Sequence, residues 1–174
     1  MPASPSIETL FFADDGIVPN NPRLPLVLYR GVLGRDGDLA ASCAAMFTAN
    51  GWPHPWRNGI YGHHHYHSTA HEVLGIAAGS ARVRLGGDSG RVVELNTGDV
   101  VVIPAGVAHK RESASAGLVV IGAYPTGQQP DLCRADPGRH DRAAATVARV
   151  ALPLADPVTG RADPLIDCWR AATS

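Results

Sequence analysis

The sequence predicts an all-β sandwich or barrel, and two observations support this fold class. Between residues 59 and 124 the chain consists of short runs of six to ten residues with the composition of strands. Turn signals separate these runs, for example Gly79-Ser80, the glycine-rich stretch 86–90 and Asn96-Thr97-Gly98. Many short strands joined by turns at this spacing are typical of β-sandwiches and β-barrels. The predicted runs are 59–68, 71–78, 80–87, 91–96, 99–105, 108–114 and 117–124.

The residues before this barrel core, 1–58, predict an arm, one strand and one helix. Three prolines in the segment 17–26 indicate an extended arm, because each proline fixes φ and removes a hydrogen-bond donor. The stretch LVLYRGVL (26–33) has the composition of a strand. Asp38 can cap a helix over 39–49, where apolar residues recur at helical spacing, and a following Asn-Gly pair ends it.

The residues after the core, 125–174, are expected to wrap over the barrel as a tail. This segment is rich in Pro, Asp and Arg and can form a helix over 139–150. Leu165, Ile166 and Trp169 are the expected apolar anchors of the tail. With 174 residues, of which 45% are hydrophobic and 18% charged, the chain fits one globular domain.

Composition and charge exclude several classes of function. A net charge of -1 without a basic block argues against nucleic-acid binding, which depends on clustered Lys and Arg. The N-terminus lacks the features of a secretory signal, and no apolar run approaches the roughly 20 residues of a membrane span. Cys43, Cys133 and Cys168 are too far apart for a disulfide framework or a CxxC metal site. We therefore expect a cytoplasmic protein that contacts neither nucleic acid nor membrane.

A histidine-rich stretch is the most informative part of the sequence. Five of the eight histidines lie within nine positions, 63–71, and a glutamate follows. On a β-strand, residues two apart share a face, so His65 and His67 project to the same side as a chelating pair should. His63 and Tyr61 are in phase with this pair, which makes them the candidates for proton transfer.

Two residues outside this stretch can complete a metal site. Glu72 begins the next predicted strand and can return towards the pair, whereas His64 and His71 should face the other way, at the surface or behind the ligands. His109 follows a sharp turn that Gly106 permits. Imidazole nitrogens and carboxylate oxygens are the ligands that divalent transition metals need. A solvated histidine-rich loop, the alternative interpretation, would predict neither the glutamate nor the distant histidine.

These residues resemble the two sequence motifs of the cupin family. The first motif is a glycine, five residues, HxH, three or four residues, a glutamate, six residues and a glycine. The second is a glycine, five residues, PxG, two residues, a histidine, three residues and an asparagine. Ser113 stands at the place of this asparagine, which puts a pocket or packing contact in question but not the metal. The matching positions are Gly59, His65, His67, Glu72 and Gly79, then Gly98, Pro104, Gly106 and His109.

The resemblance implies a jelly-roll β-barrel with one N-terminal helix and wrapping terminal segments. It also implies one divalent transition metal (Fe, Mn, Ni, Co or Zn), with one or two coordination positions left for water, dioxygen or substrate. The implied ligands are His65, His67, Glu72 and His109.

Other parts of the chain also resemble a bacterial cupin subgroup that is described as YjlB-like. The resemblance lies in the arm, in TANGW (48–52) and in the DP…G…PL…W pattern of the tail. It implies no defined reaction. By the same resemblance a homodimer is expected, with the arm at 17–33 and an edge strand as contacts.

Candidate substrate-binding residues follow the last ligand along its predicted strand. Arg111 lies two residues beyond His109, so strict alternation points it into the barrel, whereas a twisted strand would point it to solvent. Inside the barrel its guanidinium would favour an anionic molecule, because it binds carboxylates through two hydrogen bonds. Ser113 is the second candidate.

Two classes of function follow. One is an enzyme that acts on a small, anionic organic molecule, with dioxygenase-type oxidation as the leading hypothesis and metal-dependent isomerisation or decarboxylation as alternatives. The other is a non-catalytic module that binds or senses a metal and a small ligand. A purely structural barrel fits poorly with four intact ligand positions.

Overall fold

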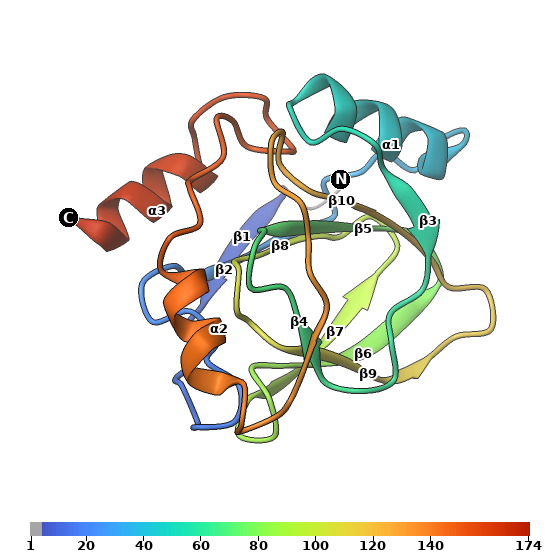
Figure 1. The fold of residues 1–174 in the computed structure, drawn as a ribbon. Coiled ribbons are helices and arrows are strands. Elements are labelled where there is room, and N and C mark those ends of the chain that lie inside the picture. The colour runs from blue at the N-terminus through green and yellow to red at the C-terminus, as the bar shows by residue number, and fades with distance from the viewer. Residues whose placement is uncertain (1–4) are drawn as a thin grey trace.

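The structure is a computed structural model that describes residues 5–174, and over this range it contains eleven strands and three helices (Figure 1). None of these helices combines the length and apolar character that a membrane span requires. The strands are β1 (Ser6–Leu10), β2 (Leu26–Arg30), β3 (Trp56–Asn58), β4 (His65–Tyr66), β5 (Glu72–Ala78), β6 (Ser80–Leu85), β7 (Arg91–Asn96), β8 (Val100–Ile103), β9 (His109–Ala114), β10 (Val119–Ala123) and β11 (Cys133–Arg134). The helices are α1 (Leu39–Ala49), α2 (His140–Val147) and α3 (Leu165–Thr173).

The strands form two antiparallel sheets that face each other (Figure 1). The six-stranded sheet has the order β1-β2-β8-β5-β10-β3, and the five-stranded sheet has the order β11-β4-β9-β6-β7. The prediction of a mostly β, jelly-roll-like fold is confirmed at this level. Two edge strands, β1 and β3, lie in the N-terminal region where the sequence predicted a single strand.

The six-stranded sheet is buried on both faces, and β8 shows how. Val101 and Ile103 point into the core between the two sheets. Val100 and Val102 point the other way, into a second core on the outer face of the sheet. A strand that is covered on both faces has no polar side, which explains the unbroken apolar run VVVI.

Helices α1 and α3 cover the outer face of this sheet. The Asp38 carboxylate accepts the Ala41 N–H at 3.0 Å and caps α1, which spans the predicted range. A Cβ on Gly75 of β5 would lie 2.4 Å from the Cys43 sulfur, so glycine is needed for the close approach of α1. The tail ends in α3, a helix that the sequence did not predict, and its anchors are buried as expected. These anchors are Leu165, Ile166 and Trp169.

The predicted ten-residue strand 59–68 is wrong in extent, because only His65 and Tyr66 are in a strand. The physical reason is that the chain changes sheets here: β3 belongs to the six-stranded sheet and β4 to the five-stranded one. Residues 59–64 make this crossing as a loop. Strand alternation therefore does not govern Tyr61 and His63.

The N-terminal arm packs against the rest of its own chain. Asn20 is fully buried in a left-handed conformation with φ of 50°. Its amide donates to the carbonyls of Ala13 (2.7 Å) and Gly86 (3.0 Å), and its carbonyl accepts the Ala108 N–H at 3.2 Å. Most of the predicted dimer contact 17–33 thus packs within one chain, although Ile17, Pro22, Arg23 and Gly31 are exposed, and the dimer stays a prediction.

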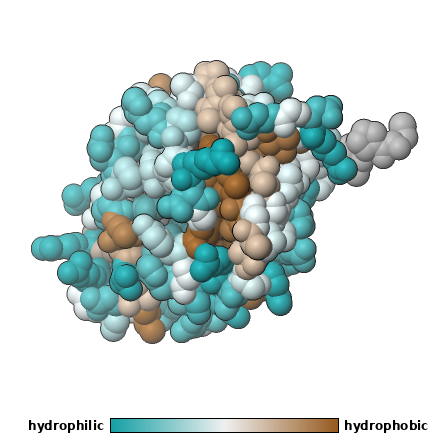
Figure 2. Space-filling view, turned by 90° about the vertical axis from the view of Figure 1, so that its right-hand side faces the viewer, coloured by the Kyte–Doolittle hydropathy of each residue, from teal (hydrophilic) through white to brown (hydrophobic). Residues whose placement is uncertain are grey.

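The right-hand side of the molecule in Figure 1 carries β3 and the start of the crossing loop. The space-filling view of this side shows a central band of apolar residues between hydrophilic ones (Figure 2). Apolar and polar surfaces therefore meet on the side where the chain passes from one sheet to the other.

Candidate metal centre

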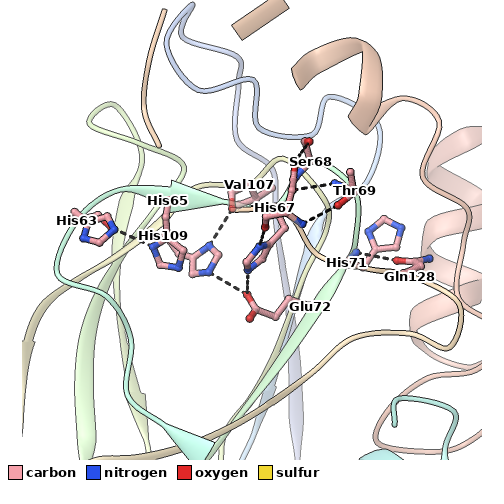
Figure 3. Close-up of polar contacts among 11 residues, drawn as sticks. His63, His65, His67, Ser68, Thr69, His71, Glu72, Val107, His109 and Gln128 are labelled. Atoms are coloured by element: carbon pink, nitrogen blue, oxygen red, sulfur yellow. Dashed lines mark hydrogen bonds and ion pairs between the residues drawn. The ribbon is translucent and has the colours of Figure 1, made fainter. Parts of the chain in front are cut away.

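Three buried side chains, His67, Glu72 and His109, converge between the two sheets (Figure 3). Each offers a ligand atom, and these atoms all lie within 4.8 Å of one another. Glu72 is the first residue of β5 and His109 the first of β9, whereas His67 directly follows β4. The group therefore joins Glu72 of the six-stranded sheet to His109 of the five-stranded sheet and to His67, which follows a strand of that second sheet.

Strand phase explains why Glu72 and His109 point inwards. Glu72 shares its face of β5 with Leu74 and Ile76, which are part of the core between the sheets. His109 pairs with Leu85 on β6, another member of this core. The alternation that the sequence predicted for these two residues is thus realised.

The distances within the group fit a shared cation. Oε2 of Glu72 lies 3.1 Å from Nε2 of His109 and 3.3 Å from Nε2 of His67. Two ligand atoms that are each about 2.1 Å from one ion, at a right angle, lie about 3.0 Å apart. This Oε2 is buried without a hydrogen-bond partner among the described residues. Because a buried carboxylate oxygen without a partner is costly, the donor set fits a metal ion.

The protonation of the imidazoles also fits metal ligation. Nδ1 of His65 lies 3.1 Å from the His63 carbonyl, and Nδ1 of His109 lies 3.1 Å from the Val107 carbonyl (Figure 3). Nδ1 of His67 bonds to the carbonyl of Asp131. A carbonyl only accepts, so each Nδ1 carries a proton, and whenever the ring is neutral its Nε2 lone pair is left for a metal.

His65 stands beside the group of three rather than within it. Its ring centroid is 4.0 Å from that of His109 but 6.1 Å from that of His67. Burial, together with the neighbouring His109 imidazole, lowers the pKa of His65 to about 3. The ring is therefore neutral at physiological pH, in the state that can ligate. The sequence predicted four ligands, and the structure brings three of them together with the fourth adjacent.

Charge within the group balances between Glu72 and the histidines. Burial alone would raise the pKa of the Glu72 carboxyl, but His67 and His109 hold it well below its usual range. Burial also lowers the pKa of His67, but the Glu72 carboxylate outweighs this and raises it above its ordinary value. A proton on His67 and a metal ion thus compete for the same carboxylate.

A cavity of about 560 Å³ opens beside the group. Trp56, Ile60 and Leu74 contribute apolar wall, and Tyr61 and Arg111 contribute polar groups. This volume lies within the range of about 300–1,000 Å³ that is typical of small-molecule sites.

Of the two residues predicted for proton transfer, only one lines the cavity. Tyr61 lines the cavity and is 52% exposed, which places it at the rim. His63 does not line the cavity; it stacks on the Tyr61 ring with the centroids 5.1 Å apart. In a strand these two residues would share one face. Residues 59–64 form a loop instead, so only Tyr61 reaches the cavity.

The two predicted substrate residues also separate. Arg111 lines the cavity and is also exposed to solvent, and its partner across the ladder is Val83 of the core between the sheets. A register shift between Arg82 and Val83 then places Ser113 opposite the exposed Arg82. Ser113 is exposed and lies outside the cavity lining, because this bulge reverses the alternation after Arg111.

His64 and His71 are outside the group, but only the first is near the surface. Nε2 of His64 lies 2.8 Å from the carboxylate of Asp88, which is 87% exposed. His71 is fully buried on the outer side of β5, where its ring centroid lies 4.7 Å from that of Trp169. Its Nδ1 accepts the Ala105 N–H at 2.9 Å. His71 was expected at the surface or behind the ligands, and it lies instead in the core beneath the tail.

Sequence reasoning missed Tyr124 and Asp131. Tyr124 lines the cavity, and its ring centroid lies 5.4 Å from that of His67. Burial and the Glu72 carboxylate raise the pKa of Tyr124, so its hydroxyl stays protonated. Strand alternation could have found Tyr124, because it lies four residues after Val120 and so continues the same face of β10. Val120 belongs to the core between the sheets. Asp131 lies in the tail, where no periodicity marked it.

The two facing sheets and the group of three potential ligands fit a mostly β protein with a candidate metal site, and the comparisons identify its family. Residues 53–121 match the cupin domain. The chain is 41% identical over 162 residues to the uncharacterized protein YjlB of Bacillus subtilis, covering 93% of this chain and 96% of that protein. The chain therefore belongs to the cupin family and is YjlB-like.

Several solved structures resemble the chain more distantly. Acireductone dioxygenase from Bacillus anthracis, with a cadmium ion in its active centre, is 17% identical with a TM-score of 0.40, covering 72% of this chain and 82% of that one. The WlaRB TDP-quinovose 3,4-ketoisomerase from Campylobacter jejuni is 15% identical with a TM-score of 0.40, covering 53% and 74%. At these TM-scores neither structure bears on the activity of this chain.

Proposed function

We propose that the protein is a metal-binding cupin that binds or transforms a small organic anion at a centre formed by His65, His67, Glu72 and His109. One observation carries this proposal. The three histidines all have Nδ1 at a backbone carbonyl, while a buried oxygen of Glu72 lacks a hydrogen-bond partner within residues 5–174. This arrangement leaves the Nε2 atoms and the carboxylate oxygen available to coordinate a cation.

A bound Fe, Mn, Ni, Co or Zn ion would supply Lewis-acid chemistry, and iron with dioxygen would supply oxidation. Dioxygenase-type oxidation is the reaction that we propose first, by analogy with the family; isomerisation, decarboxylation and binding without turnover are the alternatives. The residues of the chain hold the ion and exclude bulk water, since His65, His67, Glu72 and His109 are all buried.

Arg111 supports an anionic ligand. It is the guanidinium closest in sequence to a ligand, it lines the cavity, and the ion pairs among residues 5–174 leave it unpaired. A carboxylate in the cavity can therefore pair with Arg111 while its other end approaches the metal. The hydroxyls of Tyr61 and Tyr124 can donate hydrogen bonds to such a ligand, and His63 supports Tyr61 by stacking on it.

The metal is tested by elemental analysis of protein purified without a polyhistidine tag or nickel resin. We expect close to one transition metal ion per chain in the wild type and its loss in His109→Ala. His64→Ala is the matched control, because this imidazole lies in the same stretch but outside the group. A wild type without stoichiometric metal, or a His109→Ala protein that keeps it, would contradict the proposal.

The anionic ligand is tested in the Co(II)-substituted protein. Titration with succinate and with benzoate, followed by the Co(II) absorption spectrum, should show binding that Arg111→Gln weakens about 10-fold or more. Arg82→Gln, on the outer face of the same sheet, is the control. Equal affinities in all three proteins would remove Arg111 from the site. Substrate-dependent oxygen uptake by the iron form then distinguishes oxidation from the alternatives.

We also propose a cytoplasmic homodimer. The edge strand β1 supports it, because Ile7 is 49% exposed and the following Phe11 is 61% exposed. Light scattering of the wild type and of Phe11→Ser tests the dimer; a wild-type mass of one chain would refute it.

A further inference from the structure

The segment 128–134, here called the strap, runs along the loop that carries His67. The side-chain oxygen of Gln128 accepts the backbone N–H of His71 at 3.0 Å (Figure 3). The carbonyl of Gln129 accepts the hydroxyl of Thr69 at 2.6 Å. At its end the strap becomes β11, which pairs with β4. The strap thus contacts the ligand-bearing chain from β4 to the start of β5.

Asp131 makes the central contacts of the strap, and it uses both its backbone and its side chain. Its carbonyl accepts Nδ1–H of His67. One carboxylate oxygen accepts the N–H of Ser68 at 2.6 Å and that of Thr69 at 3.3 Å, and the other accepts the Ser68 hydroxyl. Its own N–H donates to the Thr69 hydroxyl at 2.9 Å. The residue is therefore tied to three consecutive residues of the loop.

These contacts have different physical roles. The carbonyl of Asp131 selects the tautomer of His67, because an acceptor at Nδ1 leaves Nε2 free to face Glu72. The carboxylate holds this carbonyl in place, because it is bonded to Ser68 and Thr69, the neighbours of His67 in the chain. Hydrogen bonds from backbone N–H groups to a carboxylate are among the stronger ones in proteins.

His67 is the ligand that depends on a remote partner. The carbonyls at His65 and His109 each belong to a residue two positions earlier in the chain, His63 and Val107, and so come with the local backbone. The carbonyl at His67 comes from a residue 64 positions away. It also lies beyond 53–121, the part of the chain that matches the cupin domain. One of the predicted ligands is thus oriented by a segment outside the matched domain.

We propose that Asp131 is a positioning residue for His67 and that the strap thereby sets the metal affinity of the centre. The proposal rests on the proposed function, since it assumes that His67 is a ligand. It adds a requirement that the ligand motifs themselves do not contain: a tail segment that fixes the tautomer and the direction of one imidazole.

Three variants test this role. Asp131→Ala removes the carboxylate and frees the carbonyl, whereas Asp131→Asn keeps an oxygen that accepts the Ser68 N–H. Asp136→Ala is the matched control, because this carboxylate belongs to the same part of the tail but bonds to Gly138 rather than to the ligand loop. Ser68→Ala removes the hydroxyl contact alone and reports on Asp131 if Asp131→Ala does not fold.

The first measurement is the Zn(II) dissociation constant, obtained by competition with a chromophoric chelator. We expect affinity to fall about 10- to 100-fold in Asp131→Ala, as is typical when the partner of a metal-binding histidine is lost. Asp131→Asn should stay within a few-fold of the wild type, Ser68→Ala should lie between them, and Asp136→Ala should not change. Unchanged affinity in Asp131→Ala, with only a lower melting temperature of the metal-free protein, would show a merely structural role and overturn the proposal.

The second measurement is the tautomer of His67 in the metal-free protein, read from the ¹⁵N shifts of its ring at a pH high enough for the ring to be neutral. The wild type should show the Nδ1–H form, and Asp131→Ala should show a mixture of both tautomers. An unchanged tautomer would overturn the proposal even if metal affinity fell. If the wild type bound no metal, the proposed function would fail, and the tautomer would still decide whether Asp131 positions His67.

Discussion

We expect the protein to lose stability in acid because His71 is a buried, neutral histidine. The side chain is fully buried; Nδ1 accepts the Ala105 N–H at 2.9 Å, and Nε2 lies 3.1 Å from the Ala151 carbonyl. The ring must therefore be neutral with its proton on Nε2. A second proton on Nδ1 would face the Ala105 N–H and break this bond. Burial accordingly lowers the pKa of His71 from 6.5 to about 4.

The size of the effect follows from this pKa. Between pH 6.5 and about 4 the unfolded chain binds a proton at His71 that the folded protein does not. The contribution of neutral His71 to the free energy of unfolding is therefore fully present above pH 6.5, and it is lost as the pH drops towards the folded pKa. At about 1.4 kcal/mol for each pH unit, the full loss is about 3 kcal/mol, of which about 2 kcal/mol is reached at pH 5.

Urea unfolding of the metal-free protein near neutral pH and near pH 5 measures this loss. His71→Gln is the comparison, because a glutamine can accept the Ala105 N–H and donate to Ala151 without titrating. The wild type should lose about 2 kcal/mol more than the variant over this interval. Other titrating groups, such as His65 and His67, are common to both proteins and cancel in the difference. Equal losses would refute the assignment of His71 as a buried neutral imidazole.

Three further substitutions test the fold and the site. Tyr29→Phe leaves the buried Asp156 carboxylate without the Tyr29 hydroxyl, which donates to it at 2.5 Å, and should cost about 1–3 kcal/mol in urea unfolding. Gly122→Ala would place a Cβ 2.0 Å from the Trp56 ring and should cost about 1–3 kcal/mol, whereas a stability within 0.5 kcal/mol of wild type, roughly the effect of a surface substitution, would show that Trp56 moves freely. Glu72→Gln should abolish stoichiometric metal binding while the far-ultraviolet circular dichroism of the metal-free protein stays unchanged; retained metal would remove Glu72 from the ligands.

Part of the site could be predicted from local pattern because its residues lie on regular strands. Glu72 and His109 begin β5 and β9, so alternation places them with the inner core residues that follow or pair with them. Arg111 is predictable for the same reason. The same rule fails for Ser113, because a bulge adds one residue between it and Arg111. It also fails for His63, because the chain there crosses between sheets as a loop.

The sequence by itself determined the class of fold, the helix that Asp38 caps and the residues that can ligate a metal. These follow from periodicity, capping and side-chain chemistry, which act over a few neighbouring residues. The tertiary structure alone decided that Asp131 orients His67, that Tyr124 faces Glu72 and that His71 lies beneath the tail. Each of these contacts joins residues that are at least 50 positions apart, or depends on how the tail folds back over a sheet. Pairing over such distances is chosen by packing of the whole chain, and no local pattern encodes it.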